Sequence, residues 1–144
     1  MKRERIEWLL CMLVASVGLV YCLWVVPYIP TMDGPQHVLS AHIDNHYSDP
    51  GSLYPELYRL LPQYAGKGFA LIFGPLESVL PWRVALRVTH SLVGLGFAWG
   101  FALVALSLDR HRRATAMLGF LIALPWSFYM GFLQIGRASC RERV

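Results

Sequence analysis

A short polar stretch, residues 31–47, holds several of the chemically versatile side chains of an otherwise apolar chain. It reads TMDGPQHVLSAHIDNHY and carries two aspartates and three histidines. Ionisable groups next to membrane-length apolar segments are costly to keep near lipid, so such a cluster predicts a functional site. The side chains that can bind a metal ion or transfer a proton are Asp33, His37, His42 and His46.

Two chemistries fit these residues. Asp33 with His37, and His42 with His46, are spaced i, i+4, which places each pair on one face of a helix. The step from His37 to His42 turns the second pair away from the first, and no HExxH motif is present, so we assign no metal ligands. The alternative is one carboxylate acting as a general base near an acceptor hydroxyl. Asp33 is the candidate for this role, although it also suits the cap of a helix starting just after it.

Long apolar segments flank the polar stretch and must position it. Residues 6–26 make up about 21 residues, or roughly 31 Å of helix, enough to cross the hydrocarbon core. Residues 84–108 and 114–133 form two further runs of this kind. The predicted fold class is therefore all-α: a polytopic membrane protein with three transmembrane helices.

The composition supports this class. Hydrophobic residues make up 56% of the chain and charged residues 15%, whereas soluble domains carry about a quarter charged residues. The net charge is +4, but the basic residues lie at the ends of the apolar runs and in the tail, not along one amphipathic face. The expected partner is the lipid bilayer, and no nucleic acid is expected.

Basic residues before the first span set the predicted orientation. Lys2, Arg3 and Arg5 favour a cytoplasmic N-terminus under the positive-inside rule. Residues 27–83 then form the first outer loop of a multi-pass inner-membrane protein.

This loop is expected to contain short interfacial helices, one over residues 35–47 and one near residues 56–61, with a turn at residues 49–51. The apolar segment 67–80 is about 14 residues long, which favours a re-entrant or interfacial segment over a span.

Two further patterns lie at or within the second span. Arg83, Arg87 and His90 share one helical face; they either grip a phosphate of a lipid-linked substrate or extend to lipid head groups beside Trp82. A small-residue pattern built on glycines 96 and 100, with alanines 98 and 102 nearby, indicates either close helix contact or chance in a glycine-rich run.

The last ten residues, 135–144, are abruptly polar and read IGRASCRERV. The nucleotide sequence ATC GGA AGA GCG TCG TGT AGG GAA AGA GTG, which resembles a sequencing adapter, encodes them in order. We therefore expect the fold to involve residues 1–134 and the tail to be artefactual, so that the chain would be the front part of a longer protein.

Over residues 1–134 the sequence resembles bacterial membrane glycosyltransferases of the GT-C fold. The resemblance rests on a basic N-terminus, one span, an outer loop opening with an acid in PTMDGPQH, and the later segment LPWSFYMGFLQ. It implies a polyprenyl-phosphate-linked sugar donor, transfer on the outer face, and in some members a divalent metal. The catalytic acid of the first outer loop would be Asp33, although the adjacent second acid found in many members is missing.

The expected function is therefore sugar transfer from a lipid-phosphate donor on the extracytoplasmic face. Asp33 is the predicted catalytic residue, and His37, Arg83, Arg87 and His90 are the predicted substrate-binding residues. Because the resemblance implies further spans, this fragment is expected to be inactive alone. The alternative is a non-catalytic multi-span protein, such as a transporter or an assembly subunit.

Overall fold

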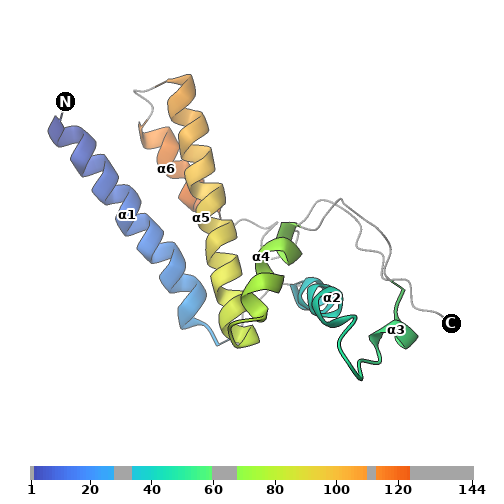
Figure 1. Ribbon diagram of the computed structural model, residues 1–144. Helices are drawn as coiled ribbons and strands as arrows, with labels where there is room; N and C mark the ends of the chain where they lie inside the picture. Colours follow the sequence, from blue (N-terminus) through green and yellow to red (C-terminus); the bar gives the residue numbers. More distant parts are fainter. Residues whose placement is uncertain (1, 28–33, 60–67, 110–112, 124–144) are drawn as a thin grey trace. The chain divides into compact units, whose positions relative to one another are not determined.

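A computed structural model describes residues 2–27, 34–59, 68–109 and 113–123, with side chains from residue 6 onward. These ranges contain no strand. Their helices are α1 (Lys2–Val25), α2 (Gly34–His46), α3 (Tyr54–Leu57), α4 (Gly68–Glu77), α5 (Trp82–Leu108) and α6 (Arg113–Ile122) (Figure 1). The all-α expectation is thus confirmed for the described part of the chain.

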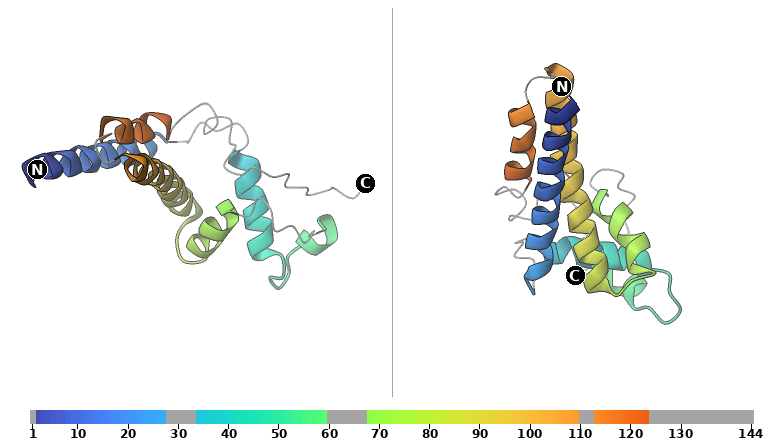
Figure 2. Two further views of the ribbon diagram at one scale, coloured as in Figure 1. Left: turned by 90° about the horizontal axis from the view of Figure 1, so that it is seen from above. Right: turned by 90° about the vertical axis from the view of Figure 1, so that its left-hand side faces the viewer.

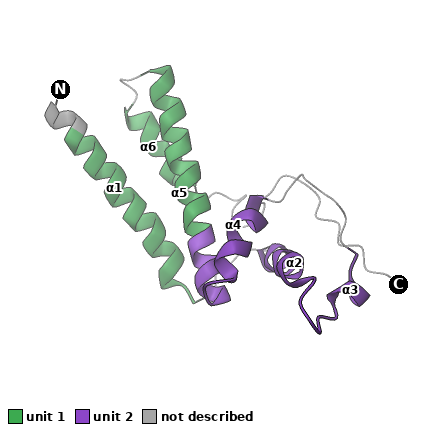
Figure 3. Ribbon diagram, in the orientation of Figure 1, with its two compact units in different colours: residues 1–30, 90–126 green, residues 31–89, 127–144 purple. Residues whose placement is uncertain are grey.

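The described helices belong to two compact units (Figure 3). Unit 1 contains α1, residues 90–108 of α5, and α6. Unit 2 contains α2, α3, α4 and residues 82–89 of α5.

Two helices are long and apolar enough to cross a membrane: Ile6–Val25 within α1, and Trp82–Leu108, which is α5. The core helix of a soluble protein would pass the same test of length and composition, but it would be mostly buried. Here 17% and 28% of the most apolar windows are buried. Large side chains such as Leu13, Val14 and Val17 are exposed along α1. This exposed apolar surface is what lipid-facing helices present.

The structure describes only part of the third predicted span, residues 114–133. The apolar helix α6 has 10 residues, which is too short to cross the hydrocarbon core. The rest of the predicted span, residues 124–133, lies outside the described residues. The described ranges therefore contain two candidate spans, not three, and the third stays a prediction.

Tryptophan side chains join the helices of unit 1. A buried indole N–H needs an acceptor, because no water replaces the lost hydrogen bond. Each indole reaches across to a neighbouring helix: Trp8 Nε1 donates to the Arg113 carbonyl oxygen at 3.4 Å, Trp24 Nε1 to Ser91 Oγ at 3.1 Å, and Trp99 Nε1 to Ser16 Oγ at 3.1 Å. These bonds link α1 to both α5 and α6, whose ribbons lie close to α1 in the views of Figure 2.

Close helix contact in unit 1 occurs at glycines other than the predicted ones. A Cβ on Gly96 or Gly100 would meet nothing within 4 Å among the described residues. By contrast, a Cβ on Gly119 of α6 would lie 2.7 Å from the carbonyl oxygen of Ala98 on α5. Among the described residues Gly96 and Gly100 therefore make no close contact themselves, whereas Ala98, which lies between them in the sequence, is where α6 approaches α5.

Unit 2 is built on the packing of α2 against α4. Its buried core consists of Ala41, Phe69, Phe73 and Ala85, and the two phenylalanine rings stack with centroids 5.4 Å apart. The predicted helix over residues 35–47 is confirmed as α2. The short apolar segment 67–80 contains α4, which continues through Pro75 to Glu77.

The small helix expected near residues 56–61 begins earlier than predicted. It is α3, with Pro55 in its first turn and Tyr58 already extended. Proline is favoured at the first helical position because its missing N–H has no helical partner to lose there. The helix accordingly begins at Tyr54, with Pro55 next, rather than at the acidic residue that follows.

Gly119→Ala should lower stability, because the added methyl group meets backbone on α5 and the two helices must separate. We expect a loss of about 1–3 kcal/mol, seen as a fall of several degrees in the thermal unfolding midpoint of the detergent-solubilised protein. Gly96→Ala is the matched control, since its Cβ enters open space. An equal fall in both variants would contradict the described α5–α6 contact.

Candidate functional site

Helix α2 brings two imidazoles to the same side of unit 2. His42 and His46 are one turn apart, and their ring centroids are 4.5 Å from each other. Between them along the helix, Asn45 also reaches toward α4. The i, i+4 spacing seen in the sequence therefore produces a pair of adjacent imidazoles.

Glu77 is the acidic residue that this pair meets. It is the last residue of α4, and its side chain is 7% exposed. A carboxylate at a helix C-terminus lies next to the negative end of the helix dipole, and burial removes the water that would otherwise stabilise it. Glu77 therefore requires donors from neighbouring elements.

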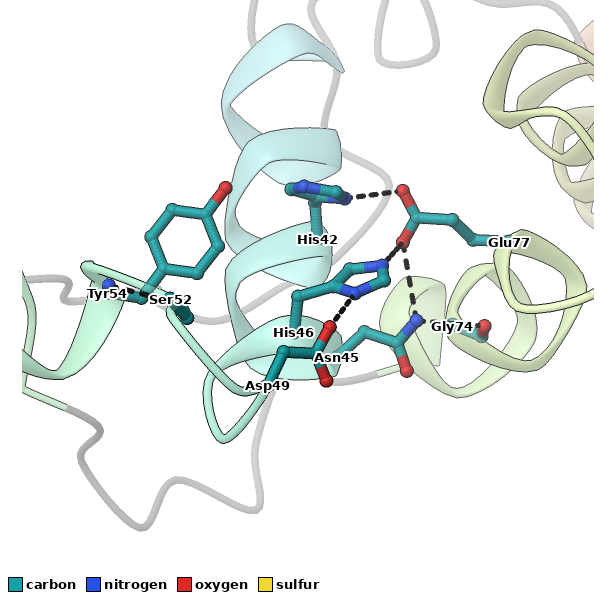
Figure 4. A network of polar contacts seen from close by, with 8 residues as sticks. All are labelled: His42, Asn45, His46, Asp49, Ser52, Tyr54, Gly74 and Glu77. Carbon is teal, nitrogen blue, oxygen red and sulfur yellow. Dashed lines mark hydrogen bonds and ion pairs between the residues drawn. The ribbon is translucent and has the colours of Figure 1, made fainter.

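Residues of α2 supply those donors (Figure 4). His42 Nδ1 lies 2.6 Å from Glu77 Oε1. Asn45 Nδ2 donates to Glu77 Oε2 at 3.5 Å and to the Gly74 carbonyl oxygen at 3.4 Å. His46 Nε2 is 3.8 Å from Glu77 Oε2. Each polar residue on this side of α2 thus contacts the end of α4.

The loop after α2 completes the cluster. The predicted turn at residues 49–51 is confirmed: the Ser52 amide donates to the Asp49 carbonyl oxygen, and Gly51 takes a positive φ of 82°. This turn places Asp49 Oδ2 2.6 Å from His46 Nδ1. Further along, the edge-on ring of Tyr54 has its centroid 6.0 Å from that of His42.

The arrangement has the elements of a metal site. One ligand atom each from His42, His46 and Glu77 lie within 4.8 Å of one another. Imidazole nitrogens and a carboxylate are ligands of zinc and related ions. Without a metal, the same groups form a hydrogen-bonded histidine–carboxylate pair that is able to exchange protons.

Among the described residues, none of the site residues predicted from the sequence belongs to the His42–His46–Glu77 cluster. Asp33, the predicted catalytic acid, lies outside the described residues. His37 is half-buried beside Phe69, with ring centroids 6.5 Å apart, and is not part of the cluster. The separation of His37 from the His42–His46 pair was expected from their spacing.

The three residues predicted to bind a phosphate at the start of α5 differ in how far their side chains are exposed. Arg83 is exposed, with its guanidinium 5.4 Å from the ring centroid of Trp82. Arg87 is half-buried, and His90 is 1% exposed. The contact of Arg83 with Trp82 fits the head-group interpretation, and substrate binding by these residues stays a prediction.

Sequence reasoning missed Glu77 and Asp49 as partners of the histidines. The available signal was an acid at the end of an apolar segment, GFALIFGPLE, together with the histidine pair on a separate helix. Linking the two required the packing of α2 on α4, which neither local pattern specifies.

Comparison with known proteins gives no match: no family model, no curated protein and no solved structure matches the chain. The functional argument therefore rests on the geometry of the site and on the pattern of the sequence.

A double-mutant cycle on His42→Ala and Glu77→Ala should show a coupling of about 1 kcal/mol in thermal or denaturant unfolding. Each single change leaves a partner without its hydrogen bond, whereas the double change removes both groups together. Glu56→Ala, an exposed acid on α3, serves as the control and should show no coupling to His42→Ala. Strictly additive effects of His42→Ala and Glu77→Ala would contradict the observed contact.

Proposed function

We propose that this chain is part of an integral membrane glycosyltransferase of the GT-C type. It would transfer a sugar from a polyprenyl-phosphate donor on the outer face of the bacterial inner membrane. The observation that carries the proposal is the place of unit 2 in the chain. Its helices α2, α3 and α4 come, in sequence, between two helices of membrane-spanning length.

The proposed topology has three spans with a cytoplasmic N-terminus. The exposed apolar surfaces of α1 and α5 support their placement in lipid. The basic residues at the start of α1, and those between α5 and α6, then lie on the cytoplasmic side under the positive-inside rule. In this topology unit 2 faces the extracytoplasmic space.

In the proposed reaction, Asp33 accepts the proton of an acceptor hydroxyl. The hydroxyl oxygen then bonds to the anomeric carbon of the sugar. The bond from that carbon to the phosphate oxygen breaks, and the polyprenyl phosphate leaves with the electron pair. Arg83 is exposed at the start of α5, where its guanidinium is suited to pair with the donor's phosphate. Arg87 and His37 are half-buried and are proposed to add further substrate contacts, whereas His90, 1% exposed, would contact substrate only after it becomes accessible.

Asp33→Asn in the complete protein should abolish sugar transfer, because the amide cannot accept the proton. The expected loss is at least about 100-fold, the lower end of the range for general-base catalysis. Transfer from a radiolabelled polyprenyl-phosphate sugar in membrane vesicles measures it, with insertion checked by protease protection.

Asp44→Asn makes the same change at an exposed position of α2 and is expected to leave transfer unchanged. Wild-type transfer by Asp33→Asn, with normal insertion, would exclude the catalytic role. Absence of sugar transfer by the complete wild-type protein would instead favour a transporter or an assembly subunit.

A further inference from the structure

We propose that His42, His46 and Glu77 bind a divalent transition-metal ion, and that Zn²⁺ fits the site best. The proposal does not depend on the glycosyltransferase function, because it uses contacts within unit 2 alone. The ligand atoms are His42 Nδ1, His46 Nε2 and the Glu77 carboxylate.

A tetrahedral ion would bind after the three ligand atoms, which lie within 4.8 Å of one another, move closer together. Zinc lies about 2.0–2.2 Å from nitrogen and oxygen ligands, so neighbouring ligand atoms are roughly 3.3 Å apart. The distance from His46 Nε2 to Glu77 Oε2 is 3.8 Å. His42 Nδ1 and Glu77 Oε1 are 2.6 Å apart, at hydrogen-bond distance. Metal binding would replace this bond: the His42 proton would move to Nε2, the Nδ1 lone pair would bind the ion, and the distance between Nδ1 and Oε1 would increase by less than about 1 Å.

Asp49 holds His46 in the orientation that metal binding requires. Its carboxylate lies 2.6 Å from His46 Nδ1, so in the metal-bound form Nδ1 would carry the proton and Nε2 would be left to bind the ion. Metal-bound histidines usually donate their second ring N–H to a carboxylate or carbonyl, which fixes the tautomer and the ring. The turn at residues 49–51 thus supplies an outer partner of the kind that a metal site uses.

Charge also favours a cation at this position. Glu77 is buried at the negative end of α4, and Asp49 adds a second carboxylate to the cluster. A divalent cation would balance both carboxylates while leaving the imidazoles neutral, the form in which they act as ligands.

The ligand types select the ion. Two imidazoles with one carboxylate suit zinc, whereas Mg²⁺ and Ca²⁺ take six or more oxygen ligands. Three protein ligands leave the fourth tetrahedral position to water, as in catalytic rather than structural zinc sites. The site would therefore be able to activate water or to polarise an oxygen of a bound molecule.

The test is Zn²⁺ binding by the 144-residue chain, purified in detergent without a polyhistidine tag. A chromogenic chelator competes for the metal, and elemental analysis after gel filtration gives the stoichiometry. The wild-type chain should hold one Zn²⁺, and Glu77→Gln and His46→Ala should each weaken binding at least about tenfold. His37→Ala is the matched control, since this histidine on the same helix lies beside Phe69 and should leave affinity unchanged.

Asp49→Asn provides a variant that is not expected to disturb folding, because the side chain is 57% exposed. It should weaken Zn²⁺ binding by about tenfold, the lower end of the effect seen for outer partners of metal ligands, with unchanged helix content by circular dichroism. Absence of Zn²⁺ from the folded wild-type chain would overturn the proposal. An equal loss in His37→Ala, or full binding by Glu77→Gln, would also overturn it.

Discussion

The carboxylate of Glu77, buried at the C-terminal end of α4, is the constraint on which unit 2 depends. Burying an unpaired carboxylate beside the negative end of a helix would cost several kcal/mol. α2 offsets this cost by directing His42, Asn45 and His46 toward that single group. A shift of one residue along α2 would turn all three away, so the apolar packing and the polar contacts specify the same register.

The parts of the fold that were predictable from sequence are those governed by local rules. Apolar length identifies α1 and α5, and the glycine–proline start identifies α2. Contacts between helices were not predictable in this way. The sequence highlights glycines 96 and 100, yet the close approach occurs at Gly119, because the relative rotation of two helices decides which small residue faces the other.

In the candidate site, too, the features within one helix were predictable from the sequence, and the contacts between helices were not. The spacing of the histidines correctly predicts that His37 lies apart from the His42–His46 pair, because helix geometry fixes the relative directions of side chains a few residues apart. It does not provide the acid that the pair meets, since Glu77 comes from a different helix. Asp33 was selected from the polar stretch and from the family resemblance, whereas the acid that meets the histidines is Glu77, 35 residues after His42.

The proposed metal site and the proposed sugar transfer are separate claims about one loop. Asp33 precedes α2 directly, and His42 and His46 lie on α2 itself. A metal held between α2 and α4 would stabilise the helix that follows the proposed catalytic acid, without itself being the base. Loss of the metal site would therefore leave the assignment of Asp33 to be judged on its own evidence.

X-ray absorption at the zinc edge, on the purified chain loaded with one equivalent of Zn²⁺, tests the central claim most directly. The account predicts nitrogen and oxygen ligands at about 2.0–2.1 Å, with the outer-shell scattering of two imidazole rings, and loss of one ring in His46→Ala. Sulfur ligation from the cysteines, or an all-oxygen shell without imidazole, would contradict the convergence of His42 and His46 on Glu77.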